Sequence, residues 1–170
     1  TKPMLPAEVK ALLTKSDTTQ TEDIYTGEMK TEIINTEVNS EAIRKYLLKE
    51  DWIFDRQRSV MDIRIIGMCP MKENIGPDGE MRGYTKLFWL YFPELRYVLV
   101  NWDVYNREND AERRSFDHLF WTRQFNSTIT KMSNVYDRNI AQHKTGIDAL
   151  LEGEEIKEYL FNFEHDLWNF

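Results

Sequence analysis

The sequence predicts an α+β fold in which an antiparallel β-meander of three or four strands is covered by amphipathic helices. Three apolar runs lie close together within residues 59–101, and short connections between such runs favour antiparallel neighbours. Segments with helical periodicity precede and follow this stretch. With 170 residues the chain can bury one core but is too short for two large domains. We therefore expect an N-terminal arm over residues 1–39 and one globular domain over residues 40–170.

Charge and cysteine content exclude several classes of partner and site. The net charge of −7 and the pI of about 5.1 oppose attraction to nucleic-acid phosphates and to anionic lipid. No apolar run approaches the length that a membrane span requires. The single cysteine, Cys69, excludes an intrachain disulfide and a cysteine metal cluster, and it leaves both the cytosol and the periplasm open. Nucleic acid is therefore not an expected partner.

The N-terminal arm is predicted to contain a short helix and a small hairpin. Pro6 can occupy the start of a helix that places Val9, Leu12 and Leu13 on one face. The polar residues 16–22 indicate a mobile linker. Residues 23–26 and 29–34 then flank Gly27 and Glu28 and are rich in β-branched side chains, which predicts a hairpin.

A second helix is expected directly before the sheet. Asn39 or Ser40 can cap it, and Glu41 in its first turn complements the helix dipole. Its apolar stripe consists of Ile43, Tyr46 and Leu47. Residues 48–59 then bring the chain into the sheet.

The three apolar runs predict the strands of the meander. Residues 61–68 alternate between apolar and charged side chains, as in a half-buried strand. Residues 84–92 are apolar or aromatic on both faces, which predicts a central, covered strand. Residues 76–79 between these runs contain glycine and proline and predict a turn. Residues 96–100 follow as a third strand, and residues 102–105 extend it or form a fourth.

Two amphipathic helices are expected after the meander. Asn109 and Glu112 have capping-box spacing, and apolar residues recurring to Met132 predict the main covering helix. Residues 133–146 indicate a connector, and residues 147–167 a terminal helix. The residues expected to form the structural core are Leu87, Trp89, Tyr91, Trp121 and Phe125.

No residue pattern predicts catalysis, a cofactor or a metal. The three histidines lack the i, i+4 spacing of a zinc site, and the adjacent pairs Asp117-His118 and His165-Asp166 are typical of helix surfaces. Cys69 before Pro70 is interpreted as a buried thiol in preference to a nucleophile. The glycines between residues 76 and 83 lack a phosphate-binding motif and indicate a turn. We expect no catalytic, cofactor-binding or metal-binding residue.

The aromatic content suggests a protein interface. A domain of this size is not expected to bury all of its five Trp, eight Tyr and nine Phe. Core packing takes most of them, and an oligomer interface, which favours Trp, Tyr and Arg, takes the rest. Helical spacing turns Phe161 and Trp168 away from the face that carries Leu160, Phe163 and Leu167. The candidate interface residues are Phe161, Trp168, Phe170, Arg56 and Arg58. Docking of the tail onto its own domain, and solvated ion pairs for the arginines, are the alternatives.

Long stretches of the chain resemble the GldN/PorN family of gliding-motility and type IX secretion proteins. They are residues 49–67, 87–94, 106–107, 116–117, 120–127 and 133–138, with residues 3–13 similar to the entry of that family into this region. Departures lie mainly in residues 74–81 and after Gln142. The resemblance therefore spans most of the chain.

The resemblance implies a noncatalytic structural subunit located in the periplasm and peripherally associated with the outer membrane. Such a protein assembles with a lipoprotein, GldK or PorK, into a ring by self-association, and contacts GldM or PorM. It also implies that a signal peptide and further residues precede Thr1. The alternative is a stand-alone domain whose aromatic residues line a small-ligand or enzymatic pocket.

Overall fold

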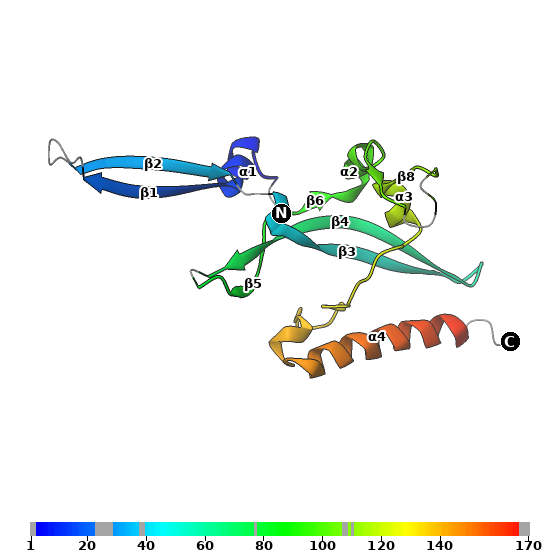
Figure 1. Cartoon of the computed structure of the whole chain (residues 1–170). Coiled ribbons are helices and arrows are strands. Elements are labelled where there is room, and N and C mark those ends of the chain that lie inside the picture. The colour runs from blue at the N-terminus through cyan, green and yellow to red at the C-terminus, as the bar shows by residue number, and fades with distance from the viewer. Residues whose placement is uncertain are drawn as a thin grey trace. The chain divides into compact units, whose positions relative to one another are not determined.

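The computed structural model describes residues 3–22, 29–37, 40–76, 78–106, 109 and 111–166 (Figure 1). They form antiparallel sheets and α-helices, so the predicted α+β class is confirmed. Two compact units are present, one made of Thr1–Lys49 with Ile65–Phe92 and the other of Glu50–Arg64 with Pro93–Phe170. The expected boundary between residues 39 and 40 stays a prediction.

The N-terminal residues form a helix followed by a β-ribbon. The predicted helix is confirmed as α1 (Pro6–Leu13), whose start is held by Glu8 Oε2 accepting from the Leu5 amide at 2.8 Å. Strand β1 (Thr14–Glu22) pairs antiparallel with β2 (Met29–Glu37). The linker predicted over residues 16–22 is therefore wrong, because pairing with β2 gives this polar segment the backbone partners that its composition did not indicate. Residues 23–28 lie outside the described part, so the hairpin as predicted, with residues 23–26 as its first arm, is not confirmed.

The largest sheet contains β3 (Ile43–Asp55), β4 (Val60–Ile75), β5 (Met81–Lys86) and the short β6 (Leu90–Tyr91). Its order is β3-β4-β5, and β6 also pairs with β4. The prediction of a helix after Ser40 is wrong: the chain forms the 3-10 turn η1 (Ser40–Ala42) there and then enters β3 directly. The apolar residues of this segment have helical spacing, but its backbone pairs with β4 and forms a strand. This tertiary pairing outweighs the local helix propensity.

The central strand is β4, not the predicted run over residues 84–92. Residues 61–68 lie within β4, as expected, and Lys86 pairs with Met71 and Tyr91 with Gly67 on the same neighbour. The second run is broken between β5 and β6, where the Leu87 amide donates to the Pro70 carbonyl at 3.1 Å. The predicted turn is confirmed: the Gly79 amide donates to the Gly76 carbonyl at 3.0 Å and Gly79 has a φ of 76°.

Three of the five expected core residues are largely exposed. The exposed fractions are 54% for Trp89, 59% for Tyr91 and 75% for Trp121, so the prediction that they form the core is wrong. Leu87 and Phe125 are half-buried. The buried apolar residues among those described are Met68, Cys69, Phe92 and Ile140.

The third apolar run is a helix and not a strand. Helix α2 (Phe92–Leu99) contains residues 96–99. Pro93 is compatible with this helix because backbone N–H groups in the first turn have no intrahelical acceptor, so the missing N–H of proline costs no hydrogen bond there. Leu95 and Leu99 lie one turn apart and are half-buried, which is the helical spacing that the strand prediction overlooked.

The second unit continues through short elements. Strand β7 (Asp103–Val104) pairs with β8 (Arg114–Ser115), and α3 (Phe116–Trp121) follows. The Asn109 side chain accepts from the Ala111 amide at 3.2 Å and forms a turn there, and α3 is capped by Ser115. The long covering helix predicted to reach Met132 is wrong, because the chain adopts a φ of 53° at Arg123 directly after α3.

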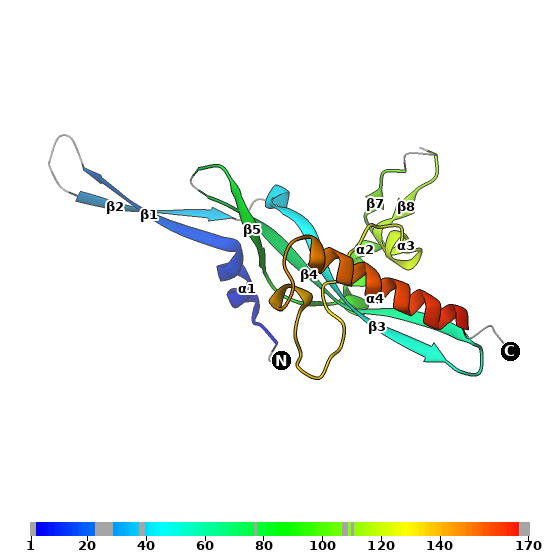
Figure 2. The ribbon, with the colours of Figure 1, turned by 90° about the horizontal axis from the view of Figure 1, so that it is seen from below.

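The terminal helix is confirmed as α4 (Ile147–Asp166), drawn in Figure 2 as one uninterrupted helix. It follows the predicted connector, which includes the 3-10 turn η2 (Ile140–Gln142). The Ile129 backbone lies against α4 at Gly153, which explains why a residue without a side chain occupies this helical position. A Cβ at this position would lie 2.8 Å from the Ile129 carbonyl oxygen.

Candidate functional site

An ion pair joins β3 to the segment that follows α3. The Arg123 guanidinium donates to both carboxylate oxygens of Glu50 at 2.9 and 3.2 Å, and the Glu50 side chain is only 15% exposed. The indole of Trp52 donates to the same carboxylate at 3.2 Å. Arg123 also lies over the rings of Trp52 and Phe125. A bidentate guanidinium that also makes cation–π contacts has a restricted orientation, so this cluster holds the segment in place.

A second bidentate pair joins α2 to α3. Arg96 Nε and Nη2 donate to the two oxygens of Asp117 at 2.7 and 3.0 Å. This neighbour raises the pKa of Arg96 above its ordinary value. The Phe116 amide donates to the Trp102 carbonyl at 3.0 Å, which attaches the start of α3 to the residue before β7. These hydrogen bonds hold α2, α3 and the start of β7 together.

Large aromatic side chains are exposed on α2 and α3 and on the residues that flank β7. We call them the α2–α3 aromatic surface; its residues, with their exposed fractions, are Tyr97 79%, Trp102 66%, Tyr105 76% and Trp121 75%. The Arg96 guanidinium lies 5.9 Å from the Trp121 ring. Exposed aromatic residues beside a fixed arginine have the composition of protein-binding surfaces.

Helix α4 has one packed and one exposed face. Ile156 and Leu160 are half-buried, and the Phe163 ring meets the Phe54 ring edge-on with centroids 5.7 Å apart. Phe161 points elsewhere and is 67% exposed, and its ring stacks on His165 with centroids 6.4 Å apart. The outward orientation predicted for Phe161 from helical spacing is therefore confirmed.

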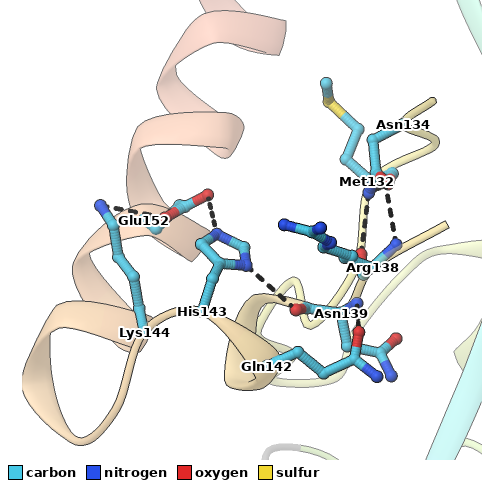
Figure 3. Close-up of polar contacts among 8 residues, drawn as sticks. All are labelled: Met132, Asn134, Arg138, Asn139, Gln142, His143, Lys144 and Glu152. Carbon is cyan, nitrogen blue, oxygen red and sulfur yellow. Dashed lines mark hydrogen bonds and ion pairs between the residues drawn. The ribbon is translucent and has the colours of Figure 1, made fainter. Parts of the chain in front are cut away.

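A polar network attaches the connector to α4 (Figure 3). His143 Nε2 lies 3.0 Å from Glu152 Oε1, and its Nδ1 lies 3.2 Å from the Asn139 carbonyl. Lys144 lies 3.0 Å from the other oxygen of Glu152. The Asn134 side chain bridges the carbonyls of Met132 and Arg138 at 2.9 and 2.8 Å.

The charges in this network stabilise each other in their ionised forms. Hydrogen bonds from Lys144 and then from His143 lower the pKa of Glu152, and the bond to Glu152 raises the pKa of Lys144. Both values thus move away from neutral pH, whereas a general acid or base requires a pKa near the working pH. A shallow hollow beside the network is lined by His143, Lys144, Thr145, Asp148, Leu151 and Glu155, without a Trp, Tyr or Phe.

The structure places the expected interface residues in different settings. Phe161 is exposed on α4, and Trp168 and Phe170 lie outside the described residues. Arg56 is exposed in the turn between β3 and β4. Arg58 in the same turn donates to Asp55 at 2.9 Å, and backbone amides of Gln57 and Arg58 lower the pKa of that carboxylate. The alternative of a solvated ion pair therefore describes Arg58 in this structure.

Comparison with known proteins gives a family for the chain. The family model described as "Gliding motility associated protein GldN" matches residues 1–169. The chain belongs to the GldN family. It is thus a component of the gliding-motility and type IX secretion machinery, which confirms the resemblance found in the sequence. No curated protein matches the chain. Within the described residues, no helix is both long and apolar enough to cross a membrane.

The two arginine–carboxylate pairs, Arg123–Glu50 and Arg96–Asp117, are structural contacts that sequence reasoning missed. Glu50 and Arg123 each lie in a stretch that carries the family resemblance, and so does Asp117. Arg96 lies just after such a stretch. The residue types alone give no signal of pairing, because 73 positions separate Glu50 from Arg123. Among the described residues, no group of three or more His, Cys, Asp or Glu side chains is placed to hold a metal.

Proposed function

We propose that this chain is a noncatalytic structural subunit of the type IX secretion and gliding machinery. In this proposal it is periplasmic and peripherally associated with the outer membrane. It forms a ring with the lipoprotein GldK or PorK and contacts GldM or PorM. Family membership supports the machinery, and the resemblance in the sequence supports the compartment and the partners.

One observation supports a binding role most strongly: large aromatic side chains are exposed on elements that bidentate ion pairs hold in place. Trp121 and Trp102 are 75% and 66% exposed, whereas Asp117, which fixes the neighbouring Arg96, has a side chain only 14% exposed. Exposed tryptophan is costly unless a partner covers it. Rigid aromatic anchors lose little conformational entropy when they are buried in an interface.

The polar network at α4 also favours a structural role. Its histidine, lysine and glutamate have their hydrogen bonds directed at each other and at the connector. The lowered pKa of Glu152 and the raised pKa of Lys144 keep both groups charged at neutral pH. The adjacent hollow lacks the aromatic lining that the small-ligand alternative requires. We interpret the network as the attachment of the connector to α4.

The exposed face of α4 is the second surface that we assign to partner binding. Phe161 is an exposed aromatic residue of α4, as is Tyr159, and Trp168 and Phe170 follow in the sequence. Arg56, which is exposed, is the basic residue that we propose for the same role, whereas Arg58 is already paired with Asp55.

Capture of this chain by the immobilised lipoprotein GldK or PorK tests the proposal. The subunit role predicts saturable capture by the lipoprotein and no capture by a lipoprotein unrelated to secretion. Equal retention on both would contradict the assigned partner.

A further inference from the structure

The β1–β2 ribbon is a two-stranded sheet whose outer edges pair with no other strand among the described residues. Each strand has nine residues, and the pairing runs from Thr14 opposite Glu37 to Glu22 opposite Met29. Within the described part of the chain, no third strand joins this sheet. Isolated two-stranded sheets are only marginally stable in water, and their outer amides and carbonyls can pair with another strand. The ribbon is therefore suited to act as a donor of strand pairing.

Strand β3 offers an edge that can accept such a strand. The order β3-β4-β5 places β3 at the border of its sheet, and no outer neighbour is found among the described residues. β3 has 13 residues, so it is longer than either strand of the ribbon. In the structure the ribbon and β3 belong to separate sheets of the same molecule. The structure thus shows no pairing of the ribbon with β3 of its own chain, and a second copy can supply the strand for this edge.

Charge favours the ribbon over other partners for this edge. The first half of β3, residues 43–49, includes Arg44, Lys45 and Lys49 and no carboxylate, and Arg44 lies 3.8 Å from Glu73 of β4. The carboxylates of β3 lie in its second half, at Glu50, Asp51 and Asp55, so the charge argument applies to the first half. Each strand of the ribbon has one lysine and two carboxylates. Lysines on an edge strand oppose pairing with a like strand, so two β3 edges repel each other, whereas the acidic ribbon is attracted.

From these observations we propose that copies of this chain join by strand addition, with the β1–β2 ribbon of one copy pairing along the β3 edge of the next. The donor and acceptor surfaces differ, so the contact is head-to-tail, and such contacts close into rings when the rotation between copies permits. The inference rests on the self-association part of the proposed function.

Thiol crosslinking between differently labelled copies tests the contact. One copy carries Thr18→Cys or Thr31→Cys in the ribbon and the other carries Tyr46→Cys in β3; the native Cys69 is fully buried and gives little background. A short bifunctional maleimide should join the ribbon variants to Tyr46→Cys. Ribbon variants paired with Thr128→Cys, an exposed position outside the sheet, should crosslink at least about tenfold less.

Charge exchange supplies a second, independent measurement. Lys45→Glu with Lys49→Glu should weaken self-association by about tenfold, since like charges then face each other. Glu32→Lys with Glu37→Lys should do the same, and a mixture of the two double variants should associate as wild type does. Lys157→Glu, an exposed change on α4, is the matched control.

The outcomes separate this inference from the proposed function. Rescue by the mixture and ribbon-to-β3 crosslinks support strand addition. If wild type and every variant self-associate equally, or if Thr128→Cys crosslinks as well as Tyr46→Cys, strand addition is overturned while the ring assignment stands. If the wild-type chain is captured by the lipoprotein but never self-associates, strand addition is overturned together with the self-association claim.

Discussion

Arg123 and Glu50 face each other across 73 residues of sequence, with both guanidinium–carboxylate hydrogen bonds at or below 3.2 Å. Arg123 follows the end of α3 and has a left-handed backbone conformation, with a φ of 53°. The guanidinium also lies 5.8 Å from the ring centre of Trp52 and 5.4 Å from that of Phe125. A segment without regular secondary structure thus has a defined position because one arginine side chain holds it.

Arg123→Lys is expected to lower the free energy of unfolding by about 1–2 kcal/mol. Lysine keeps the charge but loses the second hydrogen bond and the planar stacking surface. Arg58→Lys is the control, because its pair with Asp55 is mostly exposed and such pairs contribute little. Chemical denaturation followed by tryptophan fluorescence measures both. Equal, negligible losses in the two variants would show that the Glu50 tie is not structural.

Gly153→Ala is expected to destabilise the protein although alanine is the better helix former. Alanine gains roughly 1 kcal/mol in helix propensity over glycine. Its Cβ, however, would lie 2.8 Å from the Ile129 carbonyl oxygen, and overpacking of this kind costs about 1–3 kcal/mol. Thermal unfolding of Gly153→Ala, with Glu158→Ala as an exposed control on the same helix, measures the balance. A rise in melting temperature would mean that the Ile129 backbone does not approach α4 this closely.

Glu152→Gln is expected to reduce stability at neutral pH but not in acid. The folded pKa of Glu152 is lowered by Lys144 and His143, so its ionised form stabilises the fold. That contribution is fully present above the ordinary glutamate pKa of about 4.3 and is lost as the pH falls through the lower folded value. Unfolding measured from pH 7 down to about pH 3 checks this. A deficit of the same size at both ends of that range would rule out the ionic account.

Phe92→Ala is expected to cost about 3–5 kcal/mol and Trp89→Ala about 1–2 kcal/mol. Phe92 is 7% exposed and belongs to the core of its unit, whereas Trp89 is 54% exposed. Trp89 still covers Gly67, since its ring carbon lies 3.3 Å from the place of an added Cβ. Urea unfolding of the two variants provides the comparison. A larger loss for Trp89→Ala would restore the tryptophan to the core that the sequence predicted.

Phe161→Ser is expected to weaken capture by the lipoprotein by roughly tenfold while the melting temperature changes by only a few degrees. The residue is 67% exposed on a helix whose opposite face is packed, so the substitution removes little from the fold itself. Val135→Ser, at a 98% exposed position, is the control for a general loss of surface apolar area. Normal capture by Phe161→Ser would remove this residue from the proposed interface.

Elements with a sustained period could be predicted from the sequence. Helices α1 and α4 and the first run within β4 repeat their apolar residues often enough for the pattern to decide. The predictions failed where the period was short. Tyr46 lies in a strand because β4 supplies its partner, and α3 ends at Trp121 because Arg123 turns the chain toward Glu50.

The candidate site was accessible to sequence reasoning only in part. Helical spacing correctly predicted that Phe161 points outward, because this orientation depends only on positions along one helix. The exposure of Trp121 and the pairing of Arg96 with Asp117 depend on contacts between segments. Propensity and periodicity carry no information about such contacts. The family resemblance identified the stretches involved but not the bonds between them.

Light scattering of this chain mixed with the lipoprotein GldK or PorK tests the structural-subunit account most directly. The account predicts one species of high mass that contains both proteins and many copies of each. Two separate peaks at the masses of the individual proteins, under conditions where both remain folded, would contradict it.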